Sequence, residues 1–179
     1  AEVLEFLKTR KKLLDAVCVS GGEPTLQQDL IAFIRKIKKL GYLVKLDTNG
    51  TRPDVIERLL NGSLIDYIAM DVKAPWPKYR QIVTRVADLP LIQKSVTIIK
   101  RGRVLYEFRS TVLPALHSRE DILTMAKQIE GADKYVLQAF RPATKLVNQK
   151  FCTEASYNKK QLADFATEIG NLVRACKVR

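Results

Sequence analysis

The chain has 179 residues, of which 46% are hydrophobic, and a formal net charge of +12 at pH 7. This size and composition indicate one globular domain with a substantial core. No apolar run is long enough to span a membrane, which argues against a membrane protein. The basic residues are dispersed without interleaved aromatic residues, so we favour a solvated basic surface over a nucleic-acid footprint.

The cysteines are too far apart in sequence for a zinc or iron–sulfur motif. They are Cys18, Cys152 and Cys176. An odd number of widely spaced cysteines suits reduced thiols, and no signal peptide is visible, so we expect a cytoplasmic protein. Cys18 lies inside an apolar run and is expected in the core.

In the first half of the chain, apolar periodicity predicts three helices alternating with three strands. The predicted helices cover residues 2–12, about 30–40 and 51–61, and the strands cover residues 16–20, 42–48 and 65–72. Gly41 is a natural stop for the second helix.

The second half is less regular. Helices are expected around residues 79–86 and 89–94, and segments 96–99 and 104–112 flank a turn at Arg101-Gly102. A strand over 106–112, a helix that starts at Ser118 and runs to 130, and a strand over 135–140 follow. A polar loop containing Cys152 leads to a last helix over 158–177.

Three of the predicted strands end in polar or glycine-containing clusters, at residues 21–23, 47–50 and 71–73. Strands that alternate with helices pair in parallel, so their carboxyl ends lie at one edge of the sheet. The sequence therefore predicts an α/β fold with one shared site at that edge.

These clusters resemble those of the radical S-adenosylmethionine enzymes. The motifs are Gly-Gly-Glu-Pro at 21–24, Asp-Thr-Asn-Gly at 47–50 and Met-Asp-Val-Lys at 70–73. Within that superfamily, the chain is most similar to the activating proteins of anaerobic ribonucleotide reductase and pyruvate formate-lyase. The likeness runs from about residue 1 to 140, and 141–179 form a divergent loop and helix. The family's Cys-x3-Cys-x2-Cys run is absent, so we expect the chain to begin just downstream of it.

The resemblance implies a partial (β/α)6 TIM-like barrel whose first β/α unit is missing or incomplete, forming a single radical S-adenosylmethionine core over residues 1–179. It implies an oxidoreductase that cleaves S-adenosylmethionine reductively with a [4Fe–4S] cluster and yields a 5′-deoxyadenosyl radical. The implied partners are a glycyl-radical enzyme, such as anaerobic ribonucleotide reductase, and an electron donor, such as flavodoxin or ferredoxin. Since the cluster cysteines are absent, this chain alone is expected to be inactive and to hold no catalytic residue.

The resemblance also assigns cofactor contacts. Gly21, Gly22 and Glu23 would receive the amino group of S-adenosylmethionine, and Lys73 would neutralise its carboxylate. A tight turn and a salt bridge to Asp71 or Asp47 are the respective alternatives. The resemblance also places Asp71 among the residues that bind S-adenosylmethionine.

A monovalent cation beside the cofactor is implied at Asp47, Thr48 and Asp71. Capping and turn stabilisation are the alternative.

Further contacts are expected on later strands. Arg109 could contact ribose or a substrate, or form an ion pair with Glu107. Gln138 could contact adenosine. The single histidine, His117, has no nucleophile beside it in the sequence and is expected in a surface or capping role.

Two other functions remain open at the level of sequence. One is a radical S-adenosylmethionine enzyme that acts on a small molecule such as a deazapurine precursor. The other is a basic nucleic-acid-binding α/β module, which predicts salt-dependent binding to oligonucleotides.

Overall fold

The structure is a computed structural model that describes residues 2–83, 88–141, 151 and 153–179. The chain divides into two compact units. Unit 1 comprises Ala1–Asp71 and Pro90–Tyr106, and unit 2 comprises Val72–Leu89 and Glu107–Arg179. Cys152 lies outside the described residues.

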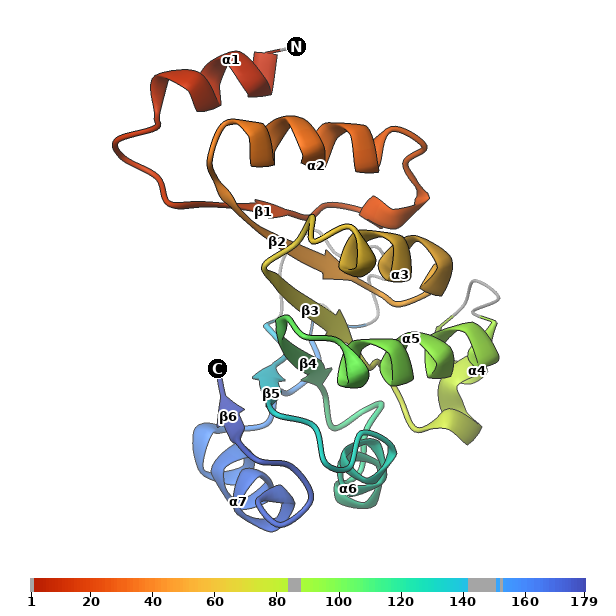
Figure 1. Cartoon of the computed structure of the whole chain (residues 1–179). Coiled ribbons are helices and arrows are strands. Elements are labelled where there is room, and N and C mark those ends of the chain that lie inside the picture. The colour runs from red at the N-terminus through yellow and green to blue at the C-terminus, as the bar shows by residue number, and fades with distance from the viewer. Residues whose placement is uncertain (1, 84–87, 142–150, 152) are drawn as a thin grey trace. The chain divides into compact units, whose positions relative to one another are not determined.

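Unit 1 contains three parallel strands and the helices that alternate with them (Figure 1). In chain order these are α1 (Glu2–Thr9), β1 (Ala16–Val19), η1 (Pro24–Leu26), α2 (Leu30–Lys39), β2 (Leu43–Thr48), α3 (Pro53–Asn61), β3 (Tyr67–Asp71) and α5 (Leu89–Arg101). β2 pairs with β1 and with β3, with Val19 opposite Leu46 and Asp47 opposite Ala69.

Unit 2 is built in the same way. Its elements are η2 (Trp76–Lys78), α4 (Tyr79–Ile82), β4 (Leu105–Val112, in this unit from Glu107 onward), α6 (Arg119–Gln128), β5 (Tyr135–Ala139), α7 (Lys159–Ile169) and β6 (Cys176–Val178). β5 pairs in parallel with β4 and β6. Helix α7 packs against β5 and β6, and α6 packs against α7.

Strand alternation gives each set of strands two different faces. In β2, Val44, Leu46 and Thr48 are buried, whereas Lys45 and Asp47 are half-buried. We call the face bearing Cys18, Lys45, Asp47 and Asp71 the polar face of unit 1. The polar face of unit 2 bears Glu107, Arg109, Thr111 and Gln138, because Thr111 is the register partner of Gln138.

Local signals in the sequence explain where helices begin. Ser118 and Asp121 form the reciprocal capping box of α6, as predicted for a helix that starts at Ser118. Asn158 and Gln161 form a second capping box at α7. None of the helices in the described residues is long and apolar enough to cross a membrane.

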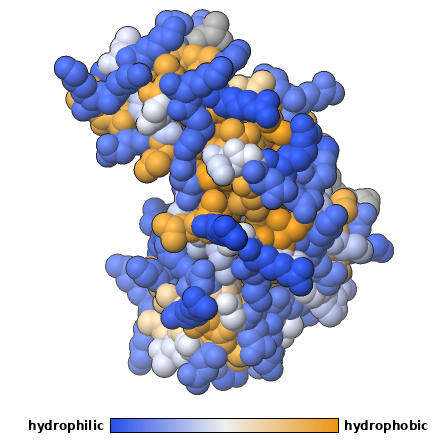
Figure 2. All heavy atoms as spheres, viewed as in Figure 1, coloured by the Kyte–Doolittle hydropathy of each residue, from blue (hydrophilic) through white to orange (hydrophobic). Residues whose placement is uncertain are grey.

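Apolar side chains also reach the surface of unit 1 near α1 (Figure 2). The most exposed near this helix are Val3, Phe6, Leu13 and Leu14. The Arg10 guanidinium lies 5.0 Å from the centre of the Phe6 ring, so the arginine covers part of this surface.

The α/β prediction with parallel strands is confirmed, but three details were wrong. Residues 96–99 belong to α5, which is one continuous helix. The last helix ends at Ile169, and a sixth strand, β6, follows it. Cys18 is exposed rather than in the core, because strand alternation directs it to the polar face.

Candidate functional site

The turn after β1 has a left-handed backbone at both glycines. Gly21 has φ of 100° and Gly22 has φ of 54°, a region that side chains other than glycine rarely adopt. A Cβ at either position would meet no heavy atom within 4 Å. The space over this turn is therefore open, and a ligand can approach the main chain closely.

The buried carboxylate of Glu23 fixes this turn to the end of β2. Its Oε1 accepts hydrogen bonds from the Thr25 amide at 3.1 Å, the Thr25 hydroxyl at 2.5 Å and the Thr48 hydroxyl at 2.8 Å. Its Oε2 accepts one from the Asn49 amide at 2.6 Å. The Glu23 carboxylate is thus engaged in structural hydrogen bonds. A ligand at this turn would therefore bind to its main chain.

Residues 47–50 form a tight loop at the end of β2. The Thr48 hydroxyl also accepts the Gly50 amide at 3.1 Å, and the Asn49 side chain accepts the Thr51 amide at 3.0 Å. These are the turn-stabilising bonds that the residue types favour. The Lys45 ammonium lies 2.8 Å from Asp47 Oδ1 on the polar face.

The same loop is packed closely against β3 and α5. A Cβ on Gly50, whose φ is 78°, would lie 2.1 Å from Met70 Cε. The Ser95 hydroxyl donates to the Gly50 carbonyl at 2.7 Å, and Met70 and Ser95 are fully buried.

Asp71 ends β3 on the polar face of unit 1. Asp47 is the register partner of Ala69, so Asp71 lies one strand across and two residues further toward the shared edge. Strand geometry puts the Cα atoms of Asp47 and Asp71 about 8 Å apart. In the described part of the chain, no three His, Cys, Asp or Glu side chains gather closely enough to hold a metal ion.

In unit 2, the segment after β3 is attached to β4 by its main chain. The Val72 amide donates to the Arg109 carbonyl at 2.8 Å, and the Ser110 hydroxyl donates to the Val72 carbonyl at 2.5 Å. The Tyr135 hydroxyl in turn donates a hydrogen bond to the Ser110 hydroxyl at 2.7 Å. The backbone that carries Lys73 is therefore fixed, while the Lys73 side chain is exposed.

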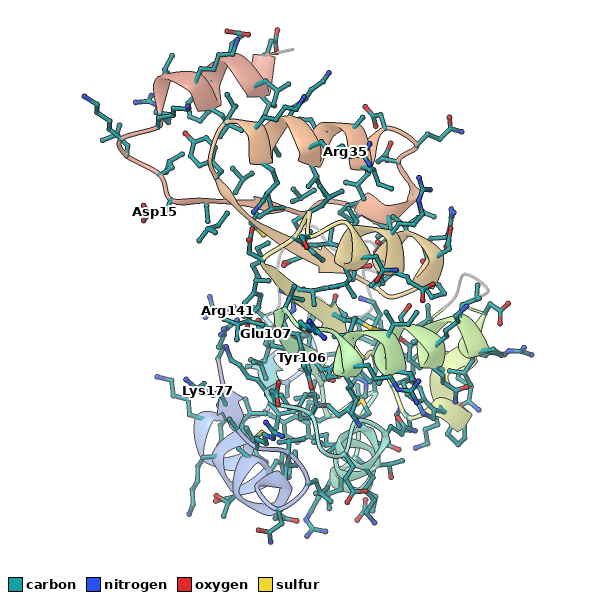
Figure 3. The ribbon with its side chains drawn as sticks, viewed as in Figure 1. Asp15, Arg35, Tyr106, Glu107, Arg141 and Lys177 are labelled. Atoms are coloured by element: carbon teal, nitrogen blue, oxygen red, sulfur yellow. The ribbon has the colours of Figure 1, made fainter. Side chains whose placement is uncertain are left out.

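Arg109 and Gln138 are both half-buried and lie on the polar face of unit 2. Glu107 of β4 and Lys177 of β6 are labelled in Figure 3. Glu107 is only 1% exposed, and its carboxylate lies 2.8 Å from Lys134 Nζ and 3.1 Å from Arg179 Nη1. These two cations compensate the buried charge of Glu107.

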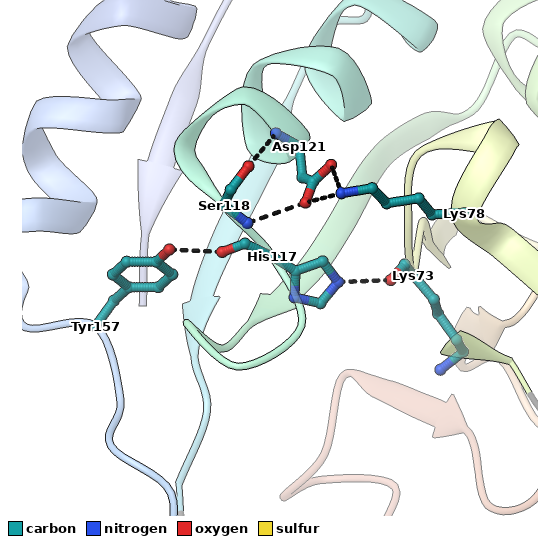
Figure 4. Close-up of polar contacts among 6 residues, drawn as sticks. All are labelled: Lys73, Lys78, His117, Ser118, Asp121 and Tyr157. Carbon is teal, nitrogen blue, oxygen red and sulfur yellow. Dashed lines mark hydrogen bonds and ion pairs between the residues drawn. The ribbon is translucent and has the colours of Figure 1, made fainter. Parts of the chain in front are cut away.

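His117 is buried, which corrects the predicted surface or capping role. Figure 4 draws its contact with Lys73. Its Nε2 lies 2.9 Å from the Lys73 carbonyl oxygen, and the Leu113 amide donates to its Nδ1 at 3.3 Å. Nothing in the sequence pairs His117 with Lys73, since 44 residues separate them.

A second polar contact lies beside His117. The Lys78 ammonium is 2.8 Å from the Asp121 carboxylate, whose Oδ2 also accepts the Ser118 amide. Partial burial raises the pKa of Asp121, but the hydrogen bonds from Lys78 and Ser118 outweigh it, so the pKa lies below its usual value. Asp121 is therefore ionised at neutral pH and holds Lys78.

The sequence of this chain is similar to those of known proteins. The profile of the Radical SAM superfamily matches residues 1–129. A protein of Methanocaldococcus jannaschii that carries the name of a glycyl-radical enzyme activating enzyme is 43% identical over 133 residues, which are 72% of this chain and 55% of that protein. A 7-carboxy-7-deazaguanine synthase of Thermoplasma acidophilum is 37% identical over 78 residues, which are 44% of this chain and 35% of that protein. The chain spans about half the length of the curated glycyl-radical relatives it matches.

Among solved structures, a domain of pyruvate-formate lyase-activating enzyme from Bacteroides vulgatus superposes with a TM-score of 0.68 at 15% identity. The match covers 92% of this chain and 98% of that domain. At this identity the likeness concerns the fold, and it agrees with the predicted parallel α/β architecture of the partial (β/α)6 type.

Proposed function

Because the chain belongs to the radical S-adenosylmethionine superfamily, a superfamily of enzymes, we propose that it forms the cofactor-binding region of a glycyl-radical-enzyme activase. The observation that carries this proposal is the open Gly21-Gly22 turn, which the buried Glu23 carboxylate holds at the end of β2. The 43% identity to a protein named for this activity supports the choice of class.

In this superfamily, bound S-adenosylmethionine supplies a 5′-deoxyadenosyl radical after one-electron reduction by a [4Fe–4S] cluster. The residues of this chain would bind and orient the cofactor. Main-chain carbonyls at Gly21 and Gly22 would accept the ammonium group, and Lys73 would neutralise the carboxylate. Both glycines have positive φ, and a Cβ at either position would meet no heavy atom within 4 Å, so no neighbouring atom blocks the approach of the cofactor to that side of the turn.

The remaining contacts extend the same proposal. Arg109 and Gln138 would contact the adenosine part, since both are half-buried on one face of adjacent strands. Asp47, Thr48 and Asp71 would help to bind a monovalent cation.

The described residues offer no set of side chains that fits a [4Fe–4S] cluster. We therefore assign no step of the reaction to a cluster held by these residues. The chain alone is expected not to cleave S-adenosylmethionine with dithionite after cluster reconstitution. Turnover by the chain alone would contradict this expectation.

The proposal is tested by measuring the affinity for S-adenosylmethionine with calorimetry for the wild type, Gly21→Ala and Gly41→Ala. Both glycines have positive φ, of 100° and 88°, and both have open space where the added Cβ would lie. Backbone strain is therefore matched, and only Gly21 lies at the proposed site. We expect Gly21→Ala to weaken binding about tenfold or more and Gly41→Ala to leave it unchanged. An absence of binding to the wild type, or equal losses in both variants, would refute the proposal.

The finer assignment is to an activase of the anaerobic ribonucleotide reductase type, served by a flavodoxin or ferredoxin. The similarity to a 7-carboxy-7-deazaguanine synthase favours a second candidate, an enzyme that acts on a small deazapurine precursor. A protein partner predicts a stable complex with a large glycyl-radical enzyme in gel filtration. A deazapurine enzyme predicts instead that the small substrate binds and that no such complex forms.

A further inference from the structure

The main chain of Lys73 is held from two sides by buried aromatic side chains. His117, which is 3% exposed, contacts the Lys73 carbonyl at 2.9 Å. Tyr79, which is 1% exposed, accepts the Lys73 amide at 3.4 Å. Ala74, the next residue, is fully buried. The exposed ammonium of Lys73 therefore extends from a backbone that cannot shift without breaking buried contacts.

The surroundings of His117 fix which ring nitrogen carries the proton. The Leu113 amide can only donate, so Nδ1 must accept and Nε2 must carry the hydrogen of a neutral ring. Nε2–H then donates to the Lys73 carbonyl. Burial lowers the pKa of His117, with Asp121 and Lys78 as the charged neighbours, and this agrees with a neutral ring at pH 7.

His117 lies in the loop between β4 and α6 and is itself anchored by neighbouring elements. The Tyr157 hydroxyl donates to the His117 carbonyl at 2.5 Å, and the Tyr157 ring packs edge-on against Phe165 of α7. Ser118, the next residue, caps α6. His117 thus connects the Lys73 segment to Tyr157, which packs on α7, and precedes the residue that caps α6. Figure 4 shows the bonds of His117 to Lys73 and Tyr157.

We propose that His117 is a positioning residue, which holds the Lys73 main chain so that the Lys73 ammonium meets the carboxylate of S-adenosylmethionine. This inference rests on the proposed function, which gives Lys73 that role. The lysine side chain is long and flexible and ends in a single point charge. When its Cα is held in place, the side chain loses less conformational entropy on binding the carboxylate. A histidine that only fills the core would have no effect specific to Lys73.

Two substitutions separate the two bonds of the ring. In His117→Gln the amide nitrogen can reach the position of Nε2 and donate to the Lys73 carbonyl. In His117→Asn the shorter amide reaches only the position of Nδ1, so the Leu113 bond is kept and the Lys73 bond is lost. We expect the dissociation constant of S-adenosylmethionine to stay within about twofold for His117→Gln and to rise about five- to tenfold for His117→Asn. Arg119→Gln, which breaks an exposed ion pair with Glu168, is the control without effect.

A double-mutant cycle gives the decisive readout. Lys73→Met should weaken binding more than tenfold, because it removes a charge-assisted contact. If His117 acts through Lys73, adding His117→Asn to Lys73→Met causes no further loss. Additive losses, or equal effects of His117→Gln and His117→Asn, would overturn the inference while the proposed function stands. If wild type does not bind S-adenosylmethionine, both fail.

Tyr79→Phe keeps the inference testable if the histidine variants do not fold. It removes only the hydroxyl that accepts the Lys73 amide and leaves the buried ring in place. We expect a two- to threefold loss of affinity that disappears in the Lys73→Met background. A loss that persists in that background would contradict the positioning role.

Discussion

The Glu23 carboxylate accepts the Thr48 hydroxyl at 2.8 Å and so joins the loop after β1 to the end of β2. Glu23 is 9% exposed and Thr48 is 3% exposed, so water competes little for this bond. The contact places the Gly21-Gly22 turn beside the loop that carries Asp47 within one compact unit.

Glu23→Ala should lower the free energy of unfolding by about 3 kcal/mol. The substitution leaves the amides of Thr25 and Asn49 and the hydroxyl of Thr48 without their acceptor. Urea titration followed by circular dichroism measures the change. Glu5→Ala, at an exposed ion pair with Lys8, is the control and should cost less than about 1 kcal/mol. Equal costs at both positions would show that Glu23 does not hold the loop.

Gly50→Ala should destabilise the protein by about 3 kcal/mol or more, because its Cβ would overlap Met70 and because φ is 78°. Gly41→Ala, at φ of 88° with open space, carries only the backbone part of that cost. The difference between the urea unfolding midpoints of Gly50→Ala and Gly41→Ala therefore measures the cost of the overlap with Met70. Shortening Met70 to Ala should make Gly50→Ala less costly in the double variant, and strictly additive costs would count against the packing described for this loop.

Stability should rise with pH between the lowered pKa of His117 and about pH 6.5. Burial lowers the pKa of His117 below its usual 6.5, so the unfolded chain binds the proton more readily than the folded one. The contribution of neutral His117 is complete above 6.5 and is lost as pH falls through the lowered value. Asp121 titrates lower, below its usual 3.8, and does not contribute in this window.

The measurement is the urea midpoint at about pH 7.5 and about pH 5.5 for wild type and His117→Gln. Wild type should lose more stability on acidification than the variant, which has no group that titrates at this position. An equal loss of stability in the two proteins between these pH values would mean that His117 is not buried as a neutral ring.

The sequence predicted those features that depend on local periodicity. Alternation of Val44, Leu46 and Thr48 with polar neighbours identified β2, and the Ser118-to-Asp121 spacing identified the start of α6. Polar clusters at strand ends predicted a shared site, because parallel strands bring those ends to one edge, and the roles of these residues stay predictions.

Other features depend on contacts that are distant in sequence. Strand β6 has only three residues, Cys176–Val178, which is too short for alternation to be visible. The β-branched residues near the end of α5 favour a strand by propensity, but tertiary packing of Ile92, Val96 and Ile99 makes the segment helical. The tie between His117 and Lys73 had no signal in the sequence, since a buried histidine is recognised only by its partners.

The proposed function requires the ends of separate strands to bind one molecule of S-adenosylmethionine. The backbone amide resonances of the 179-residue chain, followed during titration with S-adenosylmethionine, report on each of these strand ends separately. We predict saturable shifts at Gly21, Gly22, Asp71 and Lys73 with one common dissociation constant. Shifts confined to other parts of the chain, or different constants for the glycines and for Lys73, would contradict a shared binding site.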